Sequence, residues 1–216
     1  MSFRFPPIYP ILDSSFLPAS GRTAFLRDLG SALADAGVTL LEYRNKSGSD
    51  AELQADAEIL RAAMPEEQVK LILDDRAELV CAVGFDGVHV DAGDVAVREA
   101  RRLVGPGRIV GTFGGGAEGL IAGILDEPAD YFAIGPVFRT TTKETDKEPI
   151  GIDGVRRLRE QAGAGVVLTA AAGITLDSAP FVLEAGASAV AVAAGIFAAA
   201  DPAAEYLRWR ERLADF

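Results

Sequence analysis

Eight short apolar runs recur along this chain of 216 residues, and longer segments with apolar residues at helical spacing lie between them. This alternation is typical of a parallel sheet in which each strand is followed by a helix that covers it. A count of eight strands predicts an α/β fold of the closed (β/α)₈ type, a TIM barrel, that occupies residues 1–216 as a single domain. The predicted strands span residues 8–12, 39–43, 69–73, 87–90, 108–112, 131–134, 165–169 and 187–192.

The segments between these runs are predicted to be helices. In residues 23–36, Phe25, Leu29 and Leu33 fall on one face, as expected of a helix packed against the outside of a barrel. The alternative is an open doubly wound sheet, for which the glycine-rich run 111–116 is the nearest approach to a dinucleotide-binding fingerprint. That run follows the fifth strand instead of the first, so the barrel is favoured. The predicted helices span residues 23–36, 50–63, 95–103, 117–125, 153–161 and 201–213.

Charge and cysteine content argue against several functional classes. The net charge of −11 is spread along the chain, which disfavours a surface that follows the phosphates of a nucleic acid. The single cysteine, Cys81, excludes an intrachain disulfide, and its neighbours Leu79 and Val80 on a predicted short helix indicate a buried, inert thiol. Because we find no apolar signal segment and no stretch long enough to span a bilayer, we expect a cytoplasmic protein without a membrane partner.

Charged side chains follow the second, third and fourth predicted strands. Because the carboxyl ends of barrel strands share one mouth, Arg44 and Lys46 are predicted to lie near Asp75 and Asp94. The two cations suit an anionic ligand, although solvated loop residues are the alternative. The two carboxylates suit Mg²⁺, which completes its shell with water and phosphate oxygens, although an aspartate there could instead cap a helix. These residues predict a phosphorylated small molecule as the ligand.

Polar and small residues follow the sixth, seventh and eighth strands. A long polar loop, residues 139–149, carries hydroxyl groups and an ammonium group that suit diphosphate oxygens, and it is long enough to act as a lid. Gly173, Ala193 and Ala194 stand where barrels commonly bind a phosphate through backbone N–H groups, although close helix packing also favours small residues. The polar run in the loop is Thr140, Thr141, Thr142 and Lys143.

Two further features allow a structural interpretation. His89 is the only histidine, and a lone histidine at a strand end is more often a packed structural residue than a catalyst. Tyr206, Trp209 and Leu213 share one face of the last predicted helix, which indicates either packing within the chain or a contact in a homo-oligomer.

Taken in order, these motifs resemble those of the thiamine-phosphate synthase family over nearly the whole chain. The most specific part is Gly135-Pro136 followed by Thr140, Thr142 and Lys143. The matching motifs are Glu42-Tyr43-Arg44-Asn45-Lys46, Asp74-Asp75-Arg76, Gly87-Val88-His89, Asp94, Gly135-Pro136-Val137-Phe138, Thr140-Thr141-Thr142-Lys143, Gly173-Ile174-Thr175 and Ala185-Gly186-Ala187.

The resemblance implies a Mg²⁺-dependent transferase of thiamine biosynthesis. In its reaction an aminopyrimidine methyl group leaves its diphosphate as a carbocation-like species, and the ring nitrogen of a thiazole phosphate captures it. This chemistry needs charge neutralisation at the leaving diphosphate more than it needs a base. Asp75 and Asp94 are implied to bind Mg²⁺, and Arg44, Thr112 and Lys143 are implied to be catalytic. The implied substrate-binding residues are Glu42, Arg44, Lys46, Asp74, Thr112, Thr140, Thr141, Thr142, Lys143, Gly173, Ala193 and Ala194.

The chain departs from the family at several of these positions. Glu42 and Asp74 place negative charges where the family usually has glutamine and asparagine, which weakens diphosphate binding unless Mg²⁺ or Arg44 compensates. Ala194 replaces a serine. Two alternatives therefore stay open. One is a thiazole tautomerase-type isomerase, which relies on a histidine after the fifth strand, where Gly114 stands; the other is a non-catalytic phosphate-binding member of the same barrel family.

Overall fold

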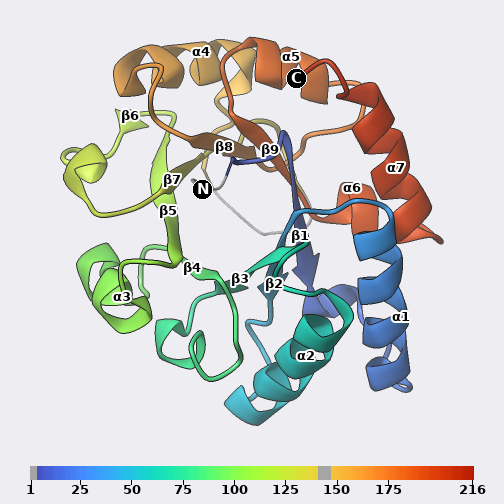
Figure 1. Cartoon of the computed structure of the whole chain (residues 1–216). Helices are drawn as coiled ribbons and strands as arrows, with labels where there is room; N and C mark the ends of the chain where they lie inside the picture. Colours follow the sequence, from blue (N-terminus) through green and yellow to red (C-terminus); the bar gives the residue numbers. More distant parts are fainter. Residues whose placement is uncertain (1–3, 141–146) are drawn as a thin grey trace.

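Eight parallel strands close into a barrel in the computed structural model, which describes residues 4–140 and 147–216 (Figure 1). The ring closes because β4 pairs with β5, with Val88 beside Val110, and β1 pairs with β9, with Tyr9 beside Ala191. This closure confirms the predicted barrel and excludes the open doubly wound sheet. The barrel strands are β1 (Ile8–Asp13), β2 (Leu40–Arg44), β3 (Lys70–Asp74), β4 (Gly87–Val90), β5 (Ile109–Gly116), β7 (Tyr131–Ile134), β8 (Leu168–Ala171) and β9 (Ala189–Val192).

Helices surround the barrel on its outside (Figure 1). Leucines on their inner faces, such as Leu26, Leu33, Leu53 and Leu60, are fully buried against the strands. No helix in the described part of the chain is both long and apolar enough to cross a membrane. The helices are α1 (Arg22–Asp35), α2 (Asp50–Ala63), α3 (Val97–Val104), α4 (Gly151–Ala162), α5 (Ala179–Glu184), α6 (Ala194–Phe197) and α7 (Pro202–Arg212), and the 3₁₀ turns are Ser14–Phe16, Ala77–Leu79 and Ile124–Asp126.

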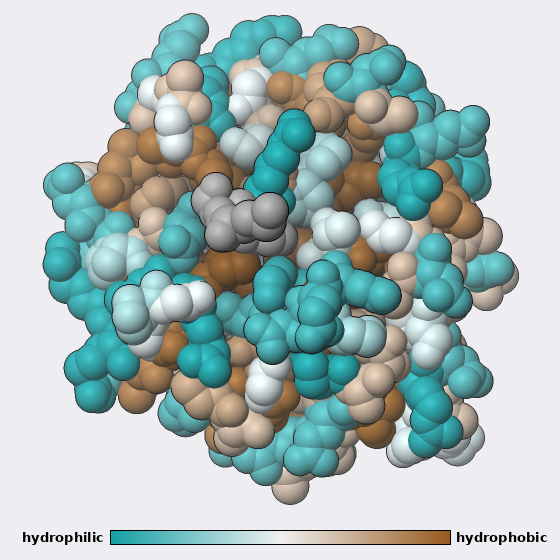
Figure 2. All heavy atoms as spheres, in the orientation of Figure 1, coloured by the Kyte–Doolittle hydropathy of each residue, from teal (hydrophilic) through white to brown (hydrophobic). Residues whose placement is uncertain are grey.

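A second, smaller apolar cluster fills the inside of the barrel. Tyr9, Leu40, Ile72 and Tyr131 belong to it and are almost completely buried. Side chains alternate along each strand between this interior and the layer under the helices. The hydrophilic residues are concentrated on the outer surface, where Figure 2 shows them over much of the visible face with hydrophobic residues exposed between them.

The helix predicted at residues 117–125 is wrong. A short strand, β6 (Gly119–Leu120), instead turns back antiparallel to β5, and a single 3₁₀ turn follows it. Gly119 and Gly123 both have positive φ angles, which side chains rarely adopt and which interrupt a helix. Gly115 packs so closely on the Gly119 backbone that a Cβ atom there would overlap it. Gly115 and Gly116, which end the run that suggested a nucleotide-binding loop, therefore serve this hairpin.

The prediction that Cys81 is buried is also wrong. The segment folds as the 3₁₀ turn Ala77–Leu79 followed by further turns, and the Cys81 side chain is exposed. Its apolar neighbour Val80 is the buried residue at this point. By contrast, the residues of the last helix, Tyr206 and Trp209, pack into the core of their own chain, so packing within the chain explains that apolar face.

Candidate active site

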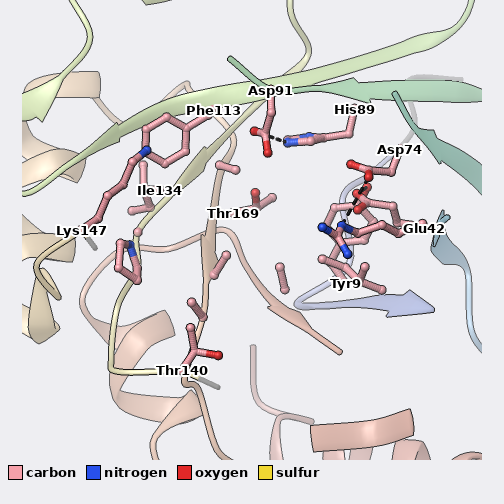
Figure 3. A pocket seen from close by; sticks show the side chains of 18 of the residues that line it. Tyr9, Glu42, Asp74, His89, Asp91, Phe113, Ile134, Thr140, Lys147 and Thr169 are labelled. Carbon is pink, nitrogen blue, oxygen red and sulfur yellow. Dashed lines mark hydrogen bonds and ion pairs between the residues drawn. The ribbon is translucent and has the colours of Figure 1, made fainter. Parts of the chain in front are cut away.

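A cavity of about 300 Å³ opens at the carboxyl ends of the barrel strands (Figure 3). Its lining combines a polar side with a wall of small and apolar residues. The polar or charged residues that line it are Tyr9, Glu42, Arg44, Asp74, His89, Asp91, Thr140, Lys147 and Thr169. The others are Ile11, Ala92, Phe113, Ala133, Ile134, Gly135, Pro136, Ala171, Ala172 and Ala191.

A chain of hydrogen bonds crosses the barrel interior beneath this cavity. The Tyr9 hydroxyl donates to Glu42 Oε2 at 2.6 Å and lies 2.7 Å from the Tyr131 hydroxyl, which lies 3.0 Å from His89 Nδ1. Because Tyr9 has one proton and gives it to Glu42, Tyr131 must donate to Tyr9 and therefore accept from His89. The other ring nitrogen, Nε2, lies 3.4 Å from Asp91 Oδ1. The geometry therefore places a proton on both nitrogens of His89.

The charges around His89 agree with this assignment. Burial alone lowers the pKa of His89, but the hydrogen bond to Asp91 and the carboxylates of Glu42 and Asp74 outweigh it and raise the pKa to about 9. Burial raises the pKa of Glu42 to about 7, with Asp74 adding to the effect and His89 opposing it. Near neutral pH the His89 ring at the cavity floor is therefore an imidazolium, stabilised by the acidic side chains of Asp91, Glu42 and Asp74.

The predicted cations and carboxylates meet at one edge of the cavity. Arg44 forms an ion pair with Asp13 at the end of β1, and its Nε lies 3.4 Å from Asp74 Oδ2. Lys46 Nζ lies 3.1 Å from the same Asp74 oxygen and forms a close ion pair with Asp75. The structure therefore brings Arg44, Lys46, Asp74 and Asp75 together, as the sequence predicted. An anionic ligand that binds these cations must compete with the carboxylates for them.

Asp75 and Asp94 form a pair of oxygen donors beside this edge. Burial and the neighbouring Asp75 carboxylate raise the pKa of Asp94 to about 6. Asp75 Oδ1 is buried and has no hydrogen-bond partner within the described ranges. Residues 4–140 and 147–216 contain no group of three or more metal-ligating side chains. Mg²⁺ commonly uses one or two carboxylates and completes its shell with water and phosphate, so this donor pair fits the ion.

The other predicted site residues differ in whether they line the cavity. Thr140 lines the cavity, whereas Thr141, Thr142 and Lys143 lie outside the described residues. Thr112 is buried and is absent from the lining, because its neighbour Phe113 takes the inward position in the alternation of β5. The remaining three lie on the loops that follow β8 and β9.

Small residues on these last loops allow close backbone contacts. Gly173 has a φ of +68°, and a Cβ atom there would overlap the Arg139 carbonyl oxygen. The adjacent Ala172 lines the cavity, also with a positive φ. Ala193 precedes and Ala194 begins the four-residue helix α6, and neither lines the cavity. Close packing is therefore what the structure shows at Gly173.

Several lining residues escaped the sequence analysis. Lys147 follows the polar run and places its Nζ 3.9 Å from the centre of the Phe113 ring, at the opposite end of the cavity from Glu42 (Figure 3). Tyr9 and Thr169 are single polar residues within apolar strand sequences. Because burying a polar group is unfavourable without a specific role, this pattern could have identified both as candidate site residues. His89 is buried as predicted for a structural residue, but it also lines the cavity.

Comparison with known proteins assigns the chain to a family. A family model described as thiamine monophosphate synthase matches residues 8–196. The chain belongs to this family. The thiamine-phosphate synthase of Koribacter versatilis (strain Ellin345) is 39% identical over 209 residues, covering 95% of this chain and 96% of that protein. The thiamine-phosphate synthase of Agrobacterium fabrum (strain C58 / ATCC 33970) is 39% identical over 180 residues, covering 82% of this chain and 81% of that protein.

A solved structure supports the same fold for this member of the thiamine monophosphate synthase family. Thiamine phosphate pyrophosphorylase from Pyrococcus furiosus superposes with a TM-score of 0.76 at 24% sequence identity, and the match covers 97% of this chain and 96% of that one. The family model and the curated relatives confirm the family resemblance predicted from the motifs. At this level of identity the structural match itself bears on the barrel and leaves the site residues to their own geometry.

Proposed function

We propose that this chain is a thiamine-phosphate synthase, which joins an aminopyrimidine methyl diphosphate to a thiazole phosphate and releases diphosphate. One observation carries the proposal: Arg44 and Lys46 converge with Asp74 and Asp75 at the edge of a cavity large enough for a small ring compound. The family and the long matches to curated synthases support it, and they favour the synthase over the tautomerase interpretation. We also expect a cytoplasmic location.

The residues of the cavity suit such a reaction in two steps. When the C–O bond to the diphosphate breaks, its electron pair leaves with the diphosphate, and Arg44 and Lys46 neutralise part of the new charge. The lone pair of the thiazole nitrogen then forms the C–N bond. Asp91, and Glu42 when it is ionised, place negative charge at the floor, where it favours a cationic methylene group during the transfer. The reaction needs no proton to be removed from the attacking nitrogen.

Magnesium belongs to this proposal. Asp75 and Asp94 would hold the ion, which when bound neutralises charge on the leaving diphosphate. The ion would also relieve the repulsion between these two carboxyl groups, which raises the pKa of Asp94. Lys46, now paired with Asp75 and Asp74, would then be available to the diphosphate.

Binding of inorganic diphosphate in the presence of Mg²⁺ tests the proposed anion site, with calorimetry as the measurement. We expect Arg44→Ala to weaken binding by roughly tenfold to a hundredfold, because hydrogen bonds to charged groups contribute about 1.5–3 kcal/mol. Arg208→Ala is the control, since Arg208 is exposed and pairs with Glu205, three residues earlier on the same helix. Equal binding by the wild type and Arg44→Ala would exclude Arg44 from the site.

A further inference from the structure

The hydroxyl of Thr169 is buried in the cavity wall without a hydrogen-bond partner among the described residues. Figure 3 shows Thr169 in the middle of the lining, between the end that carries Lys147 and the end that carries Glu42. A buried hydroxyl that makes no hydrogen bond destabilises the protein, since the group has lost its bonds to water. An uncharged group of this kind in a cavity wall can donate its hydrogen bond to a bound ligand.

The surroundings of Thr169 leave space for a flat ring. Its neighbours on the adjoining strands are Ala133 on β7 and Ala189 on β9, and Ala171 follows two positions later on the same face of β8. Ala133 and Ala171 also line the cavity, so this wall consists of methyl groups around one hydroxyl. A ring that stands edge-on to this wall brings one of its edge atoms to the Thr169 hydroxyl.

Glu42, at one end of the cavity, limits which hydrogen-bonding groups a bound ring can carry. Glu42, the acceptor of the Tyr9 hydrogen bond, carries a carboxyl group that suits a hydrogen-bond donor on the ligand. The neutral Thr169 hydroxyl can donate to a lone pair on the ligand. A ring held between the two therefore needs a donor on one edge and an unprotonated nitrogen or oxygen on another.

We propose that Thr169 is a specificity-determining residue whose hydroxyl donates a hydrogen bond to a ring nitrogen of the aminopyrimidine substrate. The proposal rests on the proposed function, because that function supplies the ring. It adds to that function a residue on β8 that recognises the ring itself, separate from Arg44 and Lys46, at and just after the end of β2, which bind the diphosphate.

Calorimetry on the full chain with two probes tests this role. The probes are the aminopyrimidine methyl diphosphate and inorganic diphosphate, each with Mg²⁺ and without thiazole phosphate, so that no transfer occurs. We expect Thr169→Val, which keeps the shape and removes the hydroxyl, to bind the pyrimidine diphosphate about tenfold more weakly. Its affinity for inorganic diphosphate should be unchanged. Thr169→Ser, which keeps the hydroxyl, should stay within roughly twofold of the wild type for both probes.

Thermal unfolding of the free proteins supplies an independent readout. Because Thr169→Val removes an unpaired buried hydroxyl, its melting temperature should equal or exceed that of the wild type, although its ligand binding is weaker. A clearly lower melting temperature would contradict the claim that this hydroxyl lacks a partner in the free protein. Thr39→Val is the matched control, since Thr39 is exposed and precedes β2 at the other end of the barrel.

The outcomes separate this proposal from the proposed function. If the wild type prefers the pyrimidine diphosphate to inorganic diphosphate and Thr169→Val keeps that preference, the role of Thr169 is wrong and the proposed function stands. Equal losses in Thr169→Val and Thr169→Ser would also overturn it, because packing would then be responsible. If the wild type shows no preference for the pyrimidine diphosphate, both proposals fall together.

Discussion

The Tyr9 hydroxyl donates a hydrogen bond of 2.6 Å to Glu42 Oε2 inside the barrel, and this bond sets the direction of every other bond in the chain that ends at His89. Tyr9 and Glu42 come from neighbouring strands, β1 and β2. The motif resemblance implies a glutamine at position 42 in the family. Relative to a glutamine, Glu42 adds a carboxyl group to the cavity floor, and this group interacts with His89.

We expect Glu42→Gln to lower the pKa of His89, because it removes one of the carboxylates that stabilise the imidazolium. Nuclear magnetic resonance can follow this titration without assignment, since His89 is the only histidine. The wild-type ring should titrate near pH 9. Glu118→Gln is the control, because Glu118 is exposed. A wild-type His89 that titrates near pH 6.5 would contradict the hydrogen-bond directions assigned to this chain.

The stability of the free protein should fall as the pH rises from about 6.5 to about 9. The pKa of His89 is raised in the folded state, so its contribution is complete below the unfolded value of 6.5 and is lost as the pH passes through about 9. Urea unfolding at several pH values measures this slope. His89→Gln should flatten the slope over this window, and an unchanged slope in the variant would show that another group is responsible.

Gly111→Ala should destabilise the barrel and disrupt the hydrogen-bond chain. A Cβ atom on Gly111 would overlap the Tyr131 ring, which is fully buried and cannot move without leaving the Tyr9 and His89 contacts. Overpacking of this kind costs about 1–3 kcal/mol. Gly107→Ala is the matched control, because a methyl group at that position would meet no atom within 4 Å beyond its chain neighbours. Equal unfolding free energies for the two variants would contradict this packing.

Cys81 should react with a thiol reagent in the native protein at a rate close to that of the unfolded chain. Its side chain is exposed, and its one hydrogen-bond contact within the described residues is a weak one, 3.9 Å from its sulfur to the Leu103 carbonyl oxygen. A colorimetric thiol assay measures the rate, with Cys81→Ser as the blank. If Cys81 reacts only after the protein unfolds, its thiol is buried, as the sequence predicted, and the exposed position is wrong.

The barrel could be predicted from the sequence because short apolar runs, which must be buried, recur along the chain. Each apolar run, such as the one around Ile72, had to be covered, and only the strand count was needed to choose the fold. The local errors came from backbone geometry. At Gly119 and Gly123 the positive φ angles overrode a helical apolar pattern, and the turns after Leu79 moved Cys81 to the surface.

The candidate site, too, could be predicted from the sequence only in part. Strand-end charges such as Arg44, Lys46 and Asp75 were predicted to meet because a barrel brings its carboxyl strand ends together. Tyr131 and Thr169 were not predicted, because contacts across the barrel interior join strands far apart in the sequence. Thr112 shows the opposite problem: a one-residue alternation decides whether a strand residue faces the cavity, and a motif match does not reveal it.

Release of diphosphate tests the central claim most directly. The wild-type protein, supplied with aminopyrimidine methyl diphosphate, thiazole phosphate and Mg²⁺, should release diphosphate only when all three are present. Asp75→Asn should reduce the rate by orders of magnitude, whereas Asp126→Asn, at an exposed position, should not change it. No release at saturating concentrations of both substrates, or equal rates for wild type and Asp75→Asn, would contradict the account.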